Sequence, residues 1–339
     1  MRFALLFPAA AMLSCSGCVV GLSRAAADAV AARALVATLP LTPTPVIADR
    51  IDVDADEQVT VTVNGQAFAA RIGPGRSSTL HLRSADAAAL FGPAATRFDQ
   101  RGDWTGATRT AERVGPVTVR GHRAPALIAF PFGTHIAPVE WFEREDADVD
   151  AGQLGAFAVP ATIVHFRLRP VQPGERSVAL PLDPEENRWG IASTSLDLGE
   201  VRVRFAVAPH LPVTVASAAA GGAMARAQGG RFTGPPQSVL ISHGVSRPAR
   251  PVLLDRPVAI GSLLVRTLLV RTLDYGAATG IADQRDEPEN PADILVTART
   301  DRQAPNYIVY LAADVLGGCS SVTFDKAAMT ITLSCLPQP

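Results

Sequence analysis

The chain has 339 residues, of which 47% are hydrophobic and 19% are charged. The length suits two domains of ordinary size, and the composition excludes a chain that is disordered throughout. Its 31 basic and 32 acidic residues give a net charge of -1. Because phosphate binding needs a positive excess, this balance argues against nucleic acid as the main partner.

Several cofactor chemistries lack the residues that they need. Lys326 is the single lysine, which disfavours Schiff-base and pyridoxal-phosphate enzymes. The sequence has no phosphate-binding loop, no dinucleotide-binding glycine motif and no HExxH motif, and its six histidines do not have the spacing of metal ligands. We therefore expect neither a cofactor nor a metal.

Residues 1–18 have the pattern of an export signal. Their apolar run is too short to cross a bilayer, and residues 16–18, Ser-Gly-Cys, resemble the small residues around a lipidated cysteine in bacterial lipoproteins, although Cys15 stands where leucine is usual. Three alternatives remain open: lipidation of Cys18, ordinary cleavage near residues 25–27, or an uncleaved anchor. Each predicts an exported protein of the periplasm or cell envelope, with the first and third tethered to the membrane.

Residues 19–46 contain an alanine-rich stretch that predicts a helix and a proline-rich stretch that predicts an extended linker. The folded body is expected to start near Ile47. Glycine and proline number 27 each, a density of turn formers that favours many short strands over a few long helices.

The first half of the body, residues 47–182, predicts hairpins around one short helix. In chain order we expect a hairpin turning at Asn64-Gly65, a tight turn at Gly73-Pro74-Gly75, a helix over 84–91, a strand pair turning at Gly121, and a closing segment over 152–171.

The second half, residues 183–339, repeats this order. We expect a hairpin turning near Pro209-His210, a small-residue loop at 216–218, a short helix over 221–230, a strand pair turning at Gly261, and a closing segment from residue 307. Matching Gly75 with Ala218 predicts two β lobes that arose by internal duplication.

Cys319 and Cys335 flank two strand-like runs around the turn Asp-Lys-Ala-Ala. Pairing Phe324 with Met329 across that turn brings the two cysteines nearly opposite each other, close enough for a disulfide in an exported protein. The alternative is two buried free thiols.

The first hairpin and the tail resemble retropepsin-like aspartic proteases. Val63-Asn64-Gly65-Gln66 is similar to the hairpin that precedes the first catalytic loop of that family. The tail residues 314–316, Asp-Val-Leu, and 322–325, Val-Thr-Phe-Asp, are similar to its closing segment, as is Leu154-Gly155 in the first half. The resemblance implies an all-β, pepsin-like fold with short helices, in which two lobes face each other across a groove.

The acids of that family are missing. Aspartic proteases share a proton between two carboxylates, one from each lobe, and repulsion between these acids separates their pKa values. The resemblance puts Gly73 at the first acid position, within the loop Gly73-Pro74-Gly75-Arg76-Ser77, and Ala216 at the second, before Ser217 and Ala218. Neither loop contains an acid.

The leading hypothesis is therefore a catalytically inactive relative that binds a peptide or protein segment in the groove. The groove candidates are Pro74, Gly75, Arg76, Ser77, Trp104, Ser217 and Ala218. The alternative is an active aspartyl peptidase or other hydrolase whose acids lie elsewhere, with Asp103, Asp197 and Asp314 to be checked.

Two further patterns have simpler interpretations. The acidic run from Glu140 to Asp150 is expected to be a solvated loop, with a weak cation site as the alternative, because its glycine and glutamate positions do not fit a calcium loop. His81 and His165 lie in strand-like runs and are expected to serve packing.

Overall fold

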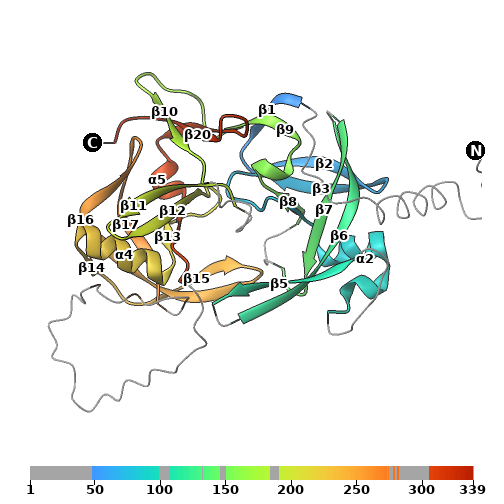
Figure 1. The fold of residues 1–339 in the computed structure, drawn as a ribbon, viewed down its shortest axis with the longest axis horizontal. Coiled ribbons are helices and arrows are strands. Elements are labelled where there is room, and N and C mark those ends of the chain that lie inside the picture. The colour runs from blue at the N-terminus through green and yellow to red at the C-terminus, as the bar shows by residue number, and fades with distance from the viewer. Residues whose placement is uncertain are drawn as a thin grey trace, which may run out of the picture.

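The structure is a computed structural model that describes residues 48–98, 107–115, 117–131, 133–145, 150–183, 191–272, 274, 278, 281 and 305–338. The expectations for the export signal, Cys18, the linker, Asp103 and Trp104 fall outside these residues. Within them the strands form three sheets, and the helices are short (Figure 1). No helix in the described ranges is both long and apolar enough to cross a membrane.

The first lobe is built on a seven-stranded sheet, within the described residues, with the order β2-β3-β8-β4-β7-β6-β5. Its elements are β2 (Glu57–Val63), β3 (Gln66–Ile72), β4 (Leu80–His81), α2 (Ser84–Phe91), η1 (Pro93–Thr96), β5 (Thr108–Val114), β6 (Val117–Phe130), β7 (Gly133–Phe142), β8 (Gly152–Leu154) and η2 (Ala156–Ala158).

The second lobe is built on a sheet with the order β11-β12-β18-β13-β17-β16-β14, with β15 also paired to β16. Its elements are β11 (Ser193–Leu198), β12 (Val201–Val207), β13 (Val215–Ala216), α4 (Ala218–Gln228), β14 (Gly230–Phe232), β15 (Gln237–Ser242), β16 (Val245–Ile260), β17 (Leu263–Arg271), β18 (Ile308–Leu311) and α5 (Ala313–Leu316).

The two lobes have one topology. In the first, β8 lies between β3, to which it is parallel, and β4, to which it is antiparallel, while β4 is parallel to β7. In the second, β18 lies between β12 and β13 with the same directions, and β13 is parallel to β17. A shared strand order with shared directions supports an origin by internal duplication.

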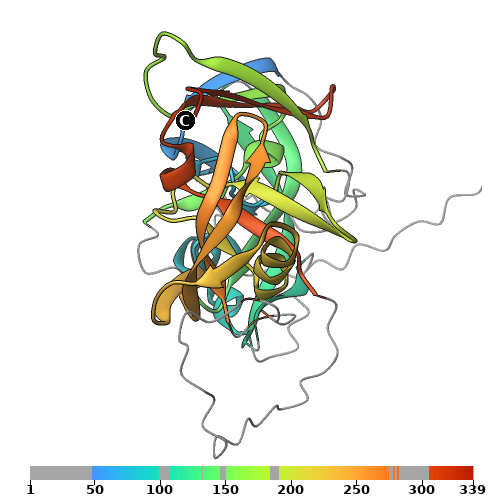
Figure 2. The same ribbon diagram turned by 90° about the vertical axis from the view of Figure 1, so that its left-hand side faces the viewer.

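A third sheet joins the halves. Its order is β1-β9-β19-β20-β10, formed by β1 (Ala48–Asp54), β9 (Ala161–Arg167), β10 (Arg176–Pro181), β19 (Cys319–Asp325) and β20 (Thr330–Cys335). The sheet lies across one end of both lobes, where blue and red strands meet in Figures 1 and 2. The closing strands β19 and β20 therefore pair with β9 and β10 of the first half, and they do not form part of the second lobe alone.

Two predicted turns are wrong. Gly121 lies inside the 14-residue strand β6, and the hairpin turns after Val114 instead; a Cβ on Gly121 would lie 2.6 Å from the ring of Phe142, so glycine serves packing there. Pro209 and His210 do not turn a hairpin, because β18 separates β12 from β13, and the hairpin before them turns between Leu198 and Val201.

The first hairpin, the helix over 84–91 and the turn at Gly261 are confirmed. The Asn64-Gly65 turn works because both residues have positive φ, which a two-residue hairpin of this type needs. A main hydrophobic core runs through both lobes and the shared sheet, with Trp141, Phe166, Phe205 and Phe324 fully buried.

The disulfide between Cys319 and Cys335 is confirmed, and the two residues are register partners in β19 and β20. The expected pairing of Phe324 with Met329 is wrong. Phe324 pairs with Ile331, because the turn comprises residues 326–329 between the partners Asp325 and Thr330. An irregularity between Cys319 and Ser321 then brings Cys319 opposite Cys335.

We predict that the double variant Cys319→Ala/Cys335→Ala lowers the free energy of unfolding by about 3 kcal/mol, since the bond closes a short loop that is otherwise free in the unfolded chain. Urea unfolding of this variant, of wild type and of wild type with reductant measures the effect. An unchanged midpoint in the variant would contradict the prediction.

Candidate functional site

Two matched loops lie where the lobes meet. The loop 73–79 follows β3 and the loop 208–214 follows β12. Gly73 N donates to Leu154 O at 3.1 Å, and Ala208 N donates to Leu311 O at 2.8 Å, so Ala208 is the counterpart of Gly73. A Cβ on Gly75, whose φ is +76°, would overlap Val207 O and lie 2.9 Å from Ala208 Cα. The two loops therefore touch through their backbones.

The prediction that Ala216 corresponds to Gly73 is wrong. Ala216 lies in strand β13, one residue after Val215, which pairs with Tyr310 as His81 pairs with Gln153 in the first lobe. The register therefore matches Ala216 with the residue after His81. The sequence misled here because a run of small residues resembles a tight loop, whereas it begins a buried helix.

Ser217 and Ala218 are also wrong as groove candidates. Both side chains are fully buried. Ser217 caps α4 by accepting a hydrogen bond from Ala220 N at 3.2 Å and donates its own hydroxyl to Asn306 O. Of the remaining candidates, Gly75, Arg76 and Ser77 line the cavity described below, and Pro74 does not.

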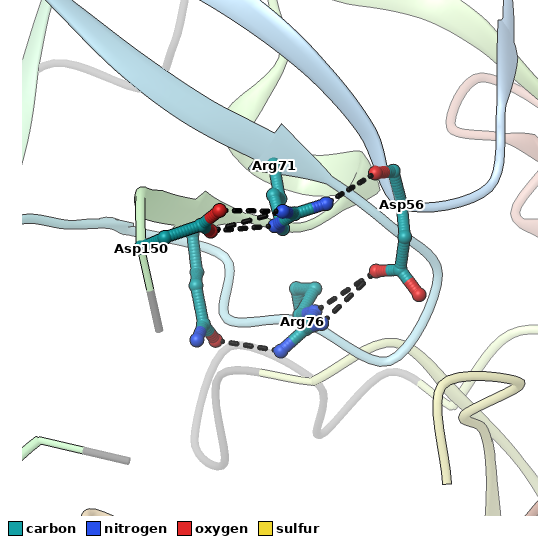
Figure 3. Close-up of polar contacts among 5 residues, drawn as sticks. Asp56, Arg71, Arg76 and Asp150 are labelled. Atoms are coloured by element: carbon teal, nitrogen blue, oxygen red, sulfur yellow. Dashed lines mark hydrogen bonds and ion pairs between the residues drawn. The ribbon is translucent and has the colours of Figure 1, made fainter. Parts of the chain in front are cut away.

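The loop 73–79 is organised around an ion pair instead of a catalytic acid. Arg76 donates to Asp56 Oδ1 at 3.0 Å and to Gln153 Oε1 at 2.8 Å, while the neighbouring Arg71 bonds Asp150 and the backbone of Asp56 (Figure 3). A Cβ on Gly73 would lie 2.7 Å from Asp56 Oδ1. The carboxylate of Asp56 thus lies where the first side-chain atom of a residue larger than glycine would be.

The loop 208–214 contributes a neutral histidine. Burial lowers the pKa of His210 to about 4, and the charge of Arg76 acts in the same direction, against the weaker opposite effect of Asp56. Neither matched loop contains an acid. The place where the lobes touch therefore carries the cation Arg76 and an uncharged imidazole rather than two carboxyls.

A pair of matched hairpins meets on the other side of the cavity. The tip of β5-β6 and the tip of β15-β16 approach each other at the bottom of Figure 1. His243 Nε2 lies 2.8 Å from Glu112 Oε2, and Ser242 donates to the same carboxylate at 3.3 Å. An apolar cluster of Val114, Val119, Phe142 and Val245, to which both lobes contribute, packs beside this contact.

A cavity of about 780 Å³ lies between the loops and the hairpins. This volume is within the range of pockets that hold small molecules or short peptide segments. Arginine is the main charged residue among the described lining residues, which include Arg76, Arg83, Arg113, Arg123, Arg144, Arg204 and Arg271 against Glu112, Glu140, Glu145 and Asp274.

Glu140 is the residue that the sequence interpretation missed. It begins the acidic run assigned to a solvated loop, but it lies in β7 with its side chain only 7% exposed. It bonds His81 Nε2 at 3.2 Å and forms an ion pair with Arg123. His81 likewise faces the cavity, so it is not a packing residue alone. Its apolar neighbours Val139, Trp141 and Phe142 were the available signal that Glu140 belongs to a strand and not to the loop.

Two of the carboxylates that line the cavity, Glu140 and Glu112, are held ionised. Burial would raise the pKa of Glu140, but hydrogen bonds and charges from His81 and Arg123 lower it overall. Burial would likewise raise the pKa of Glu112, and His243, His81 and Ser242 lower it. An aspartic-protease pair requires the opposite, one carboxyl that stays protonated at the working pH.

Asp314 and Asp197, the candidate acids within the described residues, do not form a pair. Asp314 accepts hydrogen bonds from Thr214 N and Thr214 Oγ1, which fix the loop 208–214 to α5. Asp197 is exposed in β11. Among the described residues, no group of three or more histidine, cysteine, aspartate or glutamate side chains is placed to hold a metal ion.

Comparisons with known proteins add a likeness to solved structures. No family model and no curated protein matches the chain. Among solved structures, the chain is similar to EIAV protease complexed with the inhibitor HBY-793, at 16% identity and a TM-score of 0.19, over 30% of this chain and 81% of that one. The fold class stands on strand order and register: an all-β chain with short helices and two lobes of one topology, as expected from the sequence.

We predict that the fold loses stability as pH falls from about 6.5 to about 4. His210 stays neutral in the fold over this range, whereas the unfolded chain takes up the proton, so acid favours unfolding. His210 accounts for a loss of about 1.4 kcal/mol in the free energy of unfolding for each pH unit. Urea unfolding at pH steps from 7 to 4.5 measures the slope.

The variant His210→Gln should reduce the slope of unfolding free energy against pH by about 1.4 kcal/mol per pH unit, the contribution of one proton. His135 provides a reference outside the cavity, because burial lowers its pKa to about 4 as well, and His135→Gln should give a similar reduction. An unchanged slope in His210→Gln would contradict the assignment.

Proposed function

We propose that this protein is a non-catalytic, aspartic-protease-like protein that binds a peptide or protein segment in the cavity between its lobes. The observation that carries the proposal is the contact between the loops 73–79 and 208–214. They meet at the position where the resemblance requires two acids, and they present Arg76 and His210 instead. A side chain at residue 73 would collide with the Asp56 carboxylate unless Asp56 moved away from Arg76.

The edges of the two hairpins support an extended ligand. Strands β5 and β15 pair only with β6 and β16 within the described residues, so each has one edge without a strand partner. Residues of both strands line the cavity, including Thr110 and Leu240. An extended segment can add to such an edge through backbone hydrogen bonds, which bind a chain with little regard to its sequence.

A mixed decapeptide library tests this function. The full chain is incubated with the library from pH 3 to 8, with and without an aspartic-protease inhibitor, and retained and cleaved peptides are identified by mass spectrometry after size exclusion. We expect retention of a subset of peptides and no cleavage. Inhibitor-sensitive cleavage would overturn the proposal in favour of an active peptidase, and absence of any retained peptide would overturn peptide binding.

A matched pair of variants locates the binding. Thr79 lines the cavity, so Thr79→Trp should reduce retention at least tenfold by occupying it. Val171 is 78% exposed and does not line the cavity, so Val171→Trp should bind as wild type does. Equal retention by both variants would place the peptide elsewhere.

The sequence of residues 1–18 supports a location in the cell envelope, with the chain tethered through lipid on Cys18. Cys18→Ala should then move the protein from the membrane fraction to the soluble fraction of cells that make the full chain. Unchanged membrane association in this variant, with the signal uncleaved, would favour an N-terminal anchor.

A further inference from the structure

The duplicated topology provides an internal comparison for the polar residues of the cavity. In the first lobe, His81, Glu140 and Arg123 are register partners across β4, β7 and β6. In the second lobe, the matching row across β13, β17 and β16 is Val215, Leu269 and Pro251. Val215 and Leu269 belong there to a small apolar cluster. The fold can therefore be built with apolar side chains in this row.

The polar row of the first lobe carries a large desolvation penalty, because it places a charged carboxylate in the interior. The Glu140 carboxylate is almost completely removed from water, and burial of an ion is offset only when good partners surround it. Replacement of a buried ion pair by apolar residues of similar volume is often neutral or stabilising. Stability of the fold is thus a poor explanation for this row, and a role in ligand binding is a better one.

The chemistry of the row defines what it can bind. Because Glu140 is ionised, it can only accept a hydrogen bond, so His81 Nε2 carries a proton and is the donor. In the neutral form of the ring, Nδ1 then has a lone pair that can accept a hydrogen bond. No described residue bonds Nδ1, and the His81 side chain is 22% exposed in the cavity lining. In its neutral form the ring therefore offers one acceptor to the cavity.

The surroundings fix the ring in this orientation. Its centroid lies 5.4 Å from that of Phe142 and 6.1 Å from that of His243, to which it is stacked at 25°. Arg123 forms an ion pair with Glu140 from the neighbouring strand. A carboxylate that is held on one side and bonded to a histidine on the other is a common device for fixing the tautomer and direction of an imidazole.

We propose that His81 recognises the bound segment by accepting a hydrogen bond at Nδ1 from one backbone amide of an extended peptide, with Glu140 and Arg123 as positioning residues. This inference rests on the proposed function and adds to it the residue that recognises the bound peptide. It assigns recognition to the first lobe, since the second has Val215 at the matching position.

A chemical double-mutant cycle tests the assignment. The probe is the tightest decapeptide retained from the library, synthesised with single N-methyl groups that remove one backbone N–H at a time. One N-methyl position should weaken binding to wild type about tenfold, the effect of one lost hydrogen bond. The variant His81→Val/Glu140→Leu, which copies the second lobe, should bind the unmodified peptide about tenfold more weakly and show no further loss with that N-methyl peptide.

Each outcome decides a different point. Urea unfolding of the double variant should show stability equal to or above that of wild type, and a marked loss would make the row structural and overturn the inference. Unchanged peptide affinity in a stable variant would also overturn it and leave the proposed function standing. No retained peptide on wild type would overturn both.

Discussion

The shared sheet is the constraint on which the rest of the molecule depends. Strand β9, which closes the first half, pairs with β19 from the end of the second, and β1 and β10 extend the sheet on either side. Backbone hydrogen bonds across such a sheet fix position to within one residue, because a shift by one would turn buried side chains to the solvent. The lobes are thereby set at a distance at which the loops 73–79 and 208–214 touch.

That contact explains the character of the cavity. Backbone of one lobe lies against backbone of the other at Gly75, so side chains can project only from the flanks of the contact. The flanks carry Arg76 and His210 rather than carboxylates, and two of the carboxylates that line the cavity, Glu112 and Glu140, are each paired with a histidine. Such a surface is suited to holding polar atoms in place, and the pKa values of Glu112 and Glu140 are lowered, whereas peptide hydrolysis by an acid pair requires one carboxyl that stays protonated.

The sequence predicted the parts that depend on local patterns. The Asn64-Gly65 hairpin, the helix over 84–91 and the Gly261 turn follow from turn chemistry and periodicity, and the disulfide follows from two cysteines on one hairpin. The absence of an acid at residue 73 could also be seen directly in the sequence, which has glycine there. Long-range pairing could not: the position of Ala216 depends on β18 entering between β12 and β13, which no local pattern indicates. Glu140 was misassigned because it belongs to a strand but is followed by exposed acids.

The way in which the halves are joined also governs how the chain can assemble. The contacts between β9 and β19 connect residues that are about 160 positions apart in sequence, a separation that slows folding because a long loop must close first. Until β19 is in place, β9 presents one edge of unpaired backbone groups, the feature through which β proteins aggregate. Under the proposed export, a chain that crosses a membrane from its N-terminus would keep this edge open throughout transit, and its first half would depend on protection from outside the molecule until its last strands arrive.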